Sequence, residues 1–231
     1  KTGKNMNILI SGMGVVLLFA ACTHDKHEHR EHEHHGSAND HMHQSSFEEL
    51  VQRFESPERD AYQQPEKVLE YIGDVSGKKI LDIGAGTGYF TFRLAKAGAS
   101  VIAGDVDDDF QNYIREKVEK EGLDSLNISL RKLPYDSPSL APAEVDIAII
   151  VNTYHHIENR TAYFAEVLAG LKPGGELIVI DFFKKEMPFG PPVEKKITEA
   201  QVREELAAAG FSQFEIETEL LEYQYIIRAK R

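Results

Sequence analysis

A glycine-rich stretch between residues 79 and 90 constrains the fold more than any other part of the chain. It reads Lys-Ile-Leu-Asp-Ile-Gly-Ala-Gly-Thr-Gly-Tyr-Phe, so a largely apolar run at residues 80–83 leads straight into Gly84, Gly86 and Gly88. Such a run is typical of a strand covered on both faces of a sheet. Glycines at alternate positions allow positive φ and close approach of a ligand to the backbone. The stretch predicts a buried strand, a tight turn and a helix whose first N-H groups are unpaired and face a small polar ligand.

The glycine spacing separates two classes of nucleotide-binding protein. A dinucleotide fingerprint would need its third glycine at position 89, which is Tyr89, so a nicotinamide oxidoreductase is a weak alternative. The segment Leu81-Asp-Ile-Gly-Ala-Gly-Thr-Gly88 instead resembles the first motif of the class I S-adenosylmethionine-dependent methyltransferases. This resemblance covers residues 46–231. It implies an α/β, Rossmann-like fold with a seven-stranded, mostly parallel sheet, helices on both faces and an antiparallel last strand.

An acidic residue is expected where the second strand ends. Residues 100–105 are apolar up to Asp105, which lies about 20 residues beyond the glycine loop and is placed to accept hydrogen bonds from ribose hydroxyls. Asp107 is an alternative, although residues 107–109 could simply charge the first turn of the next helix.

The third strand marks a departure from the family. Many members carry an aspartate there that binds the adenine amino group, but Arg131 and Lys132 stand at that place after a strand at residues 127–130. Adenine contacts are therefore expected elsewhere, for example at the backbone near Leu133.

The fourth strand, at residues 145–151, is followed by Asn152-Thr-Tyr-His-His156. Ligands of open α/β sheets bind beyond the carboxyl ends of the strands, so this segment is expected to face the reacting methyl group. His155 or His156 could act as a general base near neutral pH, and Tyr154 is a further catalytic candidate. In the alternative interpretation one histidine packs against the sheet and Tyr154 only closes the pocket.

The family resemblance also assigns the cofactor, S-adenosylmethionine, to particular positions. Asp82 and the glycine loop would hold its methionine portion and Asp105 its ribose, and the complete predicted set is Asp82, Gly84, Ala85, Gly86, Gly88, Asp105 and Asn152. Residues 171–175, Leu-Lys-Pro-Gly-Gly, again resemble the family and lead into a fifth strand. Residues 184–196 are the expected substrate loop.

The N-terminal 21 residues predict a lipoprotein-type signal peptide. Lysines are followed by an apolar segment, and small residues directly precede Cys22. The segment is too short and too interrupted by glycine for a transmembrane span, which needs about 20 apolar residues. Lipidation of Cys22 would anchor the protein to the membrane of a bacterial cell envelope. The alternatives are an uncleaved anchor and an apolar segment beside an unmodified thiol. A cytoplasmic location is a further alternative, because S-adenosylmethionine is made in the cytoplasm.

Residues 22–45 are rich in histidine and nearly devoid of apolar residues, so we predict a disordered linker. Neutral imidazoles at short spacings are good ligands for Zn, Ni or Cu. Loose metal capture is therefore expected at His27, His29, His32, His34 and His35. The alternative is a solvated tether.

Charge and cysteine content limit the partners. The formal net charge of −12 leaves no overall electrostatic attraction for nucleic acid, and a single cysteine excludes a multi-cysteine metal site. We therefore predict an S-adenosylmethionine-dependent methyltransferase acting on a small-molecule acceptor. The alternative is an envelope metal-binding lipoprotein with a catalytically idle methyltransferase fold.

Overall fold

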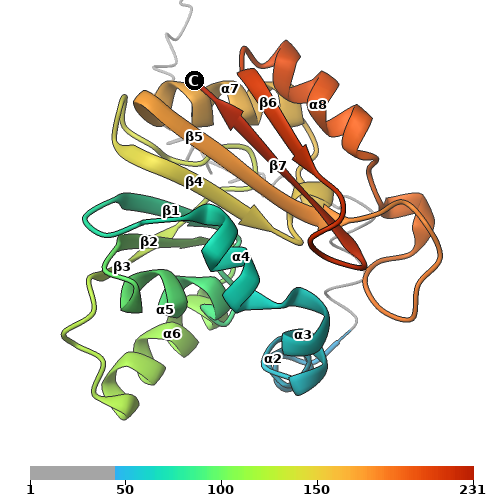
Figure 1. The fold of residues 1–231 in the computed structure, drawn as a ribbon. Helices are drawn as coiled ribbons and strands as arrows, with labels where there is room; N and C mark the ends of the chain where they lie inside the picture. The colour runs from blue at the N-terminus through green and yellow to red at the C-terminus, as the bar shows by residue number, and fades with distance from the viewer. Residues whose placement is uncertain (1–44) are drawn as a thin grey trace, which may run out of the picture. The chain divides into compact units, whose positions relative to one another are not determined.

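The computed structural model describes residues 45–231, and a seven-stranded sheet with the order β3-β2-β1-β4-β5-β7-β6 runs through them (Figure 1). Its strands are β1 (Lys79–Ile83), β2 (Ser100–Asp105), β3 (Ile128–Lys132), β4 (Val145–Val151), β5 (Leu171–Phe182), β6 (Ser212–Glu217) and β7 (Gln224–Lys230). The helices are α2 (Phe47–Phe54), α3 (Pro57–Gln63), α4 (Pro65–Ile72), α5 (Tyr89–Lys96), α6 (Asp108–Glu121), α7 (Arg160–Gly170) and α8 (Glu199–Ala208), with short 3-10 turns η1 (Tyr154–His156) and η2 (Val193–Lys195).

The strand pairing confirms the predicted sheet. Strands β1 to β5 pair in parallel, and β7 is antiparallel to both β5 and β6. The order of the strands reverses between β1 and β4, which neighbour each other through pairs such as Ile80 with Ile147. This reversal places the carboxyl ends of β1 and β4 side by side, where open α/β sheets bind ligands.

Helices cover both faces of the sheet, as expected (Figure 1). Alternate strand residues point to opposite faces, so Ile80 packs in one core with Val68 of α4 and Leu94 of α5. Leu81 packs in the other core with residues of α7 and α8 such as Val167. Helix α6 shares the first face, because its Ile114 contacts the cluster around Ala103 of β2.

Three helices precede the first strand. A capping box formed by Ser46 and Glu49 starts α2. Ser56 then accepts a hydrogen bond from the Arg59 N-H and Pro57 takes the first helical position, so a separate helix, α3, begins there. Helix α2 lies against α6, because Phe47 and Phe54 contact Phe110 with ring centroids 5.2 and 5.7 Å apart.

Strand β5 begins earlier than its apolar pattern predicts. The strand was expected from Glu176, yet Leu171 already pairs with Val145 of β4. The register shifts between Val145 and Ile147, and Gly174 has a φ of +77° within the irregular segment. Glycine permits this geometry.

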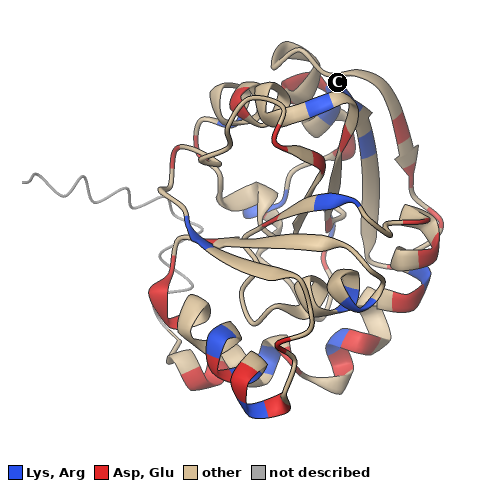
Figure 2. Cartoon of the chain, turned by 90° about the vertical axis from the view of Figure 1, so that its left-hand side faces the viewer, with Lys and Arg blue, Asp and Glu red and all other residues tan. Residues whose placement is uncertain are grey.

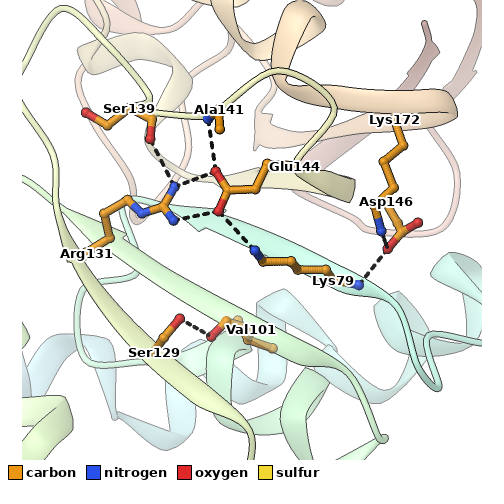
Figure 3. Close-up of polar contacts among 9 residues, drawn as sticks. All are labelled: Lys79, Val101, Ser129, Arg131, Ser139, Ala141, Glu144, Asp146 and Lys172. Carbon is orange, nitrogen blue, oxygen red and sulfur yellow. Dashed lines mark hydrogen bonds and ion pairs between the residues drawn. The ribbon is translucent and has the colours of Figure 1, made fainter.

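Arg131 and Lys132, which depart from the family pattern, both form ion pairs with acidic residues of this domain. The Arg131 guanidinium donates two hydrogen bonds to the Glu144 carboxylate, at 2.7 and 3.0 Å, and one to the Ser139 carbonyl (Figure 3). Lys132 forms an exposed ion pair with Asp108. Arg131 therefore holds the loop between β3 and β4 in place.

Within residues 45–231, no helix combines the length and the apolar character that crossing a membrane would require.

Candidate cofactor and acceptor cavity

A cavity of about 1250 Å³ opens at the carboxyl edge of the sheet. Its floor is formed by the glycine loop and by the ends of β2, β3, β4 and β5, and α2, α3 and the loop after β5 form its walls. The sequence-predicted residues that line it are Gly84, Ala85, Gly86, Asp105, Asn152, His155 and His156. The predicted Asp82, Gly88 and Tyr154 are absent from its lining.

The glycine loop contributes space to this cavity. Gly84 has a φ of +71°, and a Cβ there would lie 2.6 Å from the Thr153 side chain. The N-H groups of Gly84 and Ala85 donate to the Gly104 carbonyl, and that of Gly86 donates to the Asp105 carboxylate at 2.8 Å. The end of β2 therefore uses these three loop N-H groups to fold the loop, while the expectation of unpaired N-H groups concerns the first turn of α5, which begins at Tyr89.

Asp105 is the acidic residue at the end of β2 and lies in the cavity wall. Its carboxylate accepts hydrogen bonds from the N-H groups of Gly86, at 2.8 Å, and Asp107, at 2.9 Å. Burial raises its pKa against the effect of these hydrogen bonds. Each oxygen accepts one backbone N-H, which leaves acceptor capacity for a ligand hydroxyl. Asp107 caps α6 by accepting a hydrogen bond from the Asp109 N-H. This placement agrees with the alternative in which residues 107–109 serve the start of the next helix.

Asp82 and Gly88 lie beneath the cavity. Burial raises the Asp82 pKa to about 6, and the Thr91 hydroxyl donates a hydrogen bond of 2.6 Å to the carboxylate and opposes that rise. This bond ties β1 to α5. Gly88 is the left-handed residue before α5, and a Cβ there would lie 2.7 Å from the Phe92 ring. Both residues therefore support the shape of the loop.

Arg59 of α3 brings positive charge to the cavity, where it forms part of the wall. Its guanidinium lies over the Tyr89 ring, 3.9 Å from the centroid, and donates a hydrogen bond to the Phe54 carbonyl. Its Nε is buried and has no hydrogen-bond partner among the described residues. Burial lowers its pKa. A buried donor with no acceptor suits an anionic group of a ligand.

Asn152 lines the cavity at the end of β4 and has a φ of +56°. Its side chain belongs to a closed ring of three amides. Gln63 donates to Gln224 at 2.8 Å, Asn152 donates to Gln63 at 3.1 Å, and Gln224 donates to Asn152. The side-chain amide of Asn152 therefore holds α3 against β4 and β7.

Tyr154 lies in the core, where its side chain is fully buried. The ring stacks on Phe164 with centroids 4.9 Å apart, and the hydroxyl donates a hydrogen bond of 2.8 Å to Glu205 of α8. Burial raises the pKa of this hydroxyl. This placement favours a packing role.

His155 and His156 both line the cavity, with ring centroids 4.3 Å apart. His155 Nδ1 lies 2.9 and 3.1 Å from the two carboxylate oxygens of Asp181, at the end of β5. Burial lowers the pKa of His156 to about 3. Asp181 was missed as a site residue because it reads as part of an apolar strand. The signal that could have found it is its position, since β5 ends beside β4 at the ligand edge.

Aromatic side chains close one side of the cavity. Tyr62 of α3 stacks on Phe189 of the loop after β5, with centroids 4.4 Å apart and an interplanar angle of 16°. Tyr62 also contacts Phe182, and Phe189 contacts Tyr223. The loop expected to recognise the substrate thus meets the N-terminal helices across the cavity.

Charge is mixed along the domain surface. Figure 2 shows Lys and Arg beside Asp and Glu on the same helices, so the described residues present no basic stripe on this side. No group of three or more His, Cys, Asp or Glu residues placed to hold a metal occurs between residues 45 and 231. Cys22 and the histidines 27, 29, 32, 34 and 35 lie outside the described residues, so their predicted roles stay predictions.

Comparison with known proteins shows what the chain resembles. Residues 80–175 match the family described as "Methyltransferase domain". A solved S-adenosylmethionine-dependent methyltransferase from Aquifex aeolicus is similar, with 29% identity, a TM-score of 0.73 and coverage of 80% of this chain and 98% of that chain. The central part of the chain is thus similar to a methyltransferase domain, and its fold is similar to that of a solved methyltransferase.

Two curated relatives show what such domains do elsewhere. The ubiquinone/menaquinone biosynthesis C-methyltransferase of Shewanella pealeana is 28% identical over 121 residues, which are 51% of this chain and 48% of that protein. The tRNA U34 carboxymethyltransferase of Desulfotalea psychrophila is 30% identical over 116 residues, 49% of this chain and 35% of that protein. The chain therefore spans half or less of the length of these relatives.

Proposed function

We propose that the domain binds S-adenosylmethionine and transfers its methyl group to a small-molecule acceptor in the cavity at the carboxyl edge. The observation that carries this proposal is the meeting of three features in one cavity: the glycine loop, the Asp105 carboxylate, and a buried histidine paired with an aspartate. The first two suit the cofactor. The third suits an acceptor.

The residues present fit this cofactor. Gly84 and Gly86 leave room for close approach, the spare acceptor capacity of Asp105 suits ribose hydroxyls, and the unpaired Arg59 Nε suits the methionine carboxylate. Leu133, at the end of β3, lines the cavity and offers an apolar wall for adenine. When bound, S-adenosylmethionine supplies a methyl group on a positively charged sulfur. The chain's task is to align the acceptor with that group and to exclude water.

A small molecule is favoured over a nucleic acid as acceptor. Tyr62, Phe182 and Phe189 form an aromatic side of the cavity, and the chain carries a net charge of −12. A nucleic-acid substrate would require a basic surface to offset its phosphates.

Calorimetric titration of the full chain with S-adenosylmethionine and with its demethylated product tests the cofactor assignment. We expect both to bind, and Asp105→Ala to weaken binding by about 1–3 kcal/mol, because hydrogen bonds at a buried site are lost. Asp124→Ala, which removes an exposed carboxylate, is the matched control and should bind like the parent. A folded parent that binds neither compound would refute the proposal.

Attachment to the cell envelope is a separate part of the proposal and rests on the sequence before Cys22 alone. Palmitate carrying an isotopic label should enter the protein when it is expressed in a bacterial host, and Cys22→Ser should lose the label. Absence of label from the parent would remove the lipid anchor and favour the cytoplasmic alternative.

A further inference from the structure

The His155 side chain is held in one orientation at the acceptor side of the cavity. Asp181 accepts hydrogen bonds from the N-H groups of Phe182, at 2.8 Å, and His155, at 3.3 Å, and faces His155 Nδ1 with both oxygens. Because both Asp181 oxygens act as hydrogen-bond acceptors here, we assign the ring hydrogen of His155 to Nδ1, which faces them. The lone pair of His155 is then on Nε2.

Burial shields the hydrogen bond between His155 and Asp181 from water. The side chains of His155 and Asp181 are 4% and 1% exposed, so little water competes for the hydrogen bond between them. A proton received at Nε2 would produce an imidazolium in direct contact with a carboxylate. Burial lowers the pKa of the neighbouring His156 to about 3, which disfavours a proton on that ring.

Aromatic side chains in the lining of the same cavity indicate the kind of acceptor. Tyr62 and Phe189 stack on each other and line the cavity together with His155, and Phe182 follows Asp181 directly in β5. Flat aromatic walls favour a flat aromatic ligand. A ring hydroxyl is the group on such a ligand that needs a base, because its neutral form is a poor nucleophile.

We propose that His155 is the general base, and Asp181 its positioning residue, for O-methylation of a hydroxyl on a flat aromatic acceptor. This inference rests on the proposed function. The acceptor oxygen uses a lone pair to form the bond to the methyl carbon, and the carbon-sulfur bond breaks with its electron pair remaining on sulfur. The hydroxyl proton passes to His155 Nε2 and afterwards to water. The products are a methyl ether and the neutral thioether.

The test compares phenols of graded acidity as acceptors for the parent, His155→Gln and His156→Gln. General base catalysis contributes about 10²–10⁴-fold, so His155→Gln should lose at least about 100-fold with a weakly acidic phenol and little with a phenol already ionised at the assay pH. His156→Gln should change the rate by the same factor for every phenol. Asp181→Asn should show the same dependence on acidity as His155→Gln, in weaker form.

A second measurement requires no methyl transfer. A nitrophenol, whose ionised form absorbs visible light, is bound to the full chain without the methyl donor at a pH just below its own pKa. The parent should show the ionised band and His155→Gln should not. Calorimetry with S-adenosylmethionine verifies that each variant is folded.

The outcomes separate the two proposals. Failure of the parent to bind S-adenosylmethionine refutes the proposed function. If the parent binds S-adenosylmethionine, three outcomes overturn the assignment of His155 and its acceptor class. They are an equal loss of rate for all phenols in His155→Gln, no loss of rate in His155→Gln, and no methylation of any phenol by the parent.

Discussion

Arg59 and Arg131 are both arginines at the ends of elements, but their surroundings give them different roles. Arg131 forms two hydrogen bonds with Glu144 and stabilises a loop. Arg59 forms no ion pair among the described residues, stacks on Tyr89, and keeps a buried Nε without an acceptor. A buried cationic donor without an acceptor is suited to bind an anionic group of a ligand.

Arg59→Gln should therefore weaken binding of S-adenosylmethionine by about 1.5–3 kcal/mol, the usual effect of losing a hydrogen bond to a charged group. Calorimetry with the decarboxylated cofactor provides the control. The parent should bind this analogue weakly, and Arg59→Gln should bind the cofactor and the analogue equally well. If the substitution weakens both by the same factor, Arg59 acts only on the packing of α3.

Several residue roles could be predicted from local pattern, and others could not. Gly84, Gly86 and Asp105 reach the cavity because the strand-loop-helix pattern and the spacing to β2 determine where they lie. Tyr154 is next to His155 in sequence, yet the turn η1 directs it into the core. That direction depends on space between α7 and α8, which no short pattern encodes.

At the scale of elements, α3 is fastened to the sheet by a ring of amides. Gln63 ends α3, Asn152 follows β4 and Gln224 begins β7; Gln63 donates a hydrogen bond to Gln224, Gln224 to Asn152 and Asn152 to Gln63. Gln63 and Gln224 are fully buried. Helix α3 also carries Arg59 and Tyr62 to the cavity, so the ring determines the position of its wall.

Gln63→Leu should lower the free energy of unfolding by about 1–3 kcal/mol, because it leaves the Asn152 amide N-H and the Gln224 amide oxygen without their Gln63 partner in a buried place. Thermal unfolding followed by calorimetry measures this loss. Gln201→Ala is the matched control, since its side chain hydrogen-bonds Glu205 on the exposed side of α8, and it should change stability by less than about 0.5 kcal/mol. Equal effects of the two substitutions would contradict the role of the ring.

At the scale of the whole domain, charge at the amino edge of the sheet couples stability to pH. Glu144 accepts hydrogen bonds from Arg131, from Lys79 at 3.0 Å and from the Ala141 N-H at 3.0 Å (Figure 3). These contacts, Arg131 foremost, hold the pKa of Glu144 at about 2, below its ordinary value of 4.5. Ionised Glu144 therefore stabilises the folded state above about pH 4.5, and this contribution disappears as the pH falls toward 2.

Glu144→Gln should lower the free energy of unfolding at pH 7 by about 1–3 kcal/mol, since charge-assisted hydrogen bonds are lost. The difference from the parent should shrink between pH 4.5 and 2. Urea unfolding at a series of pH values measures it. Asp82, whose pKa is raised to about 6, makes the free energy of unfolding depend on pH in the opposite direction. Both proteins contain Asp82, so its effect cancels in the comparison. Lys132→Gln, which removes an exposed ion pair, should cost at most about 1 kcal/mol. A Glu144→Gln difference that persists unchanged to pH 2 would contradict the assignment.

The sequence by itself determined the class of fold, because buried strands, glycine turns and helix caps are local and repeat in a recognisable order. It also determined which loop and which strand ends line the cavity, since parallel strands end at the same edge. Only the tertiary structure decided that Asp181 lies against His155, that the Arg59 Nε lacks an acceptor and that Gln63, Asn152 and Gln224 form one ring. These contacts join residues 26 to 161 positions apart. Such pairs form only when packing brings separate strands and helices together.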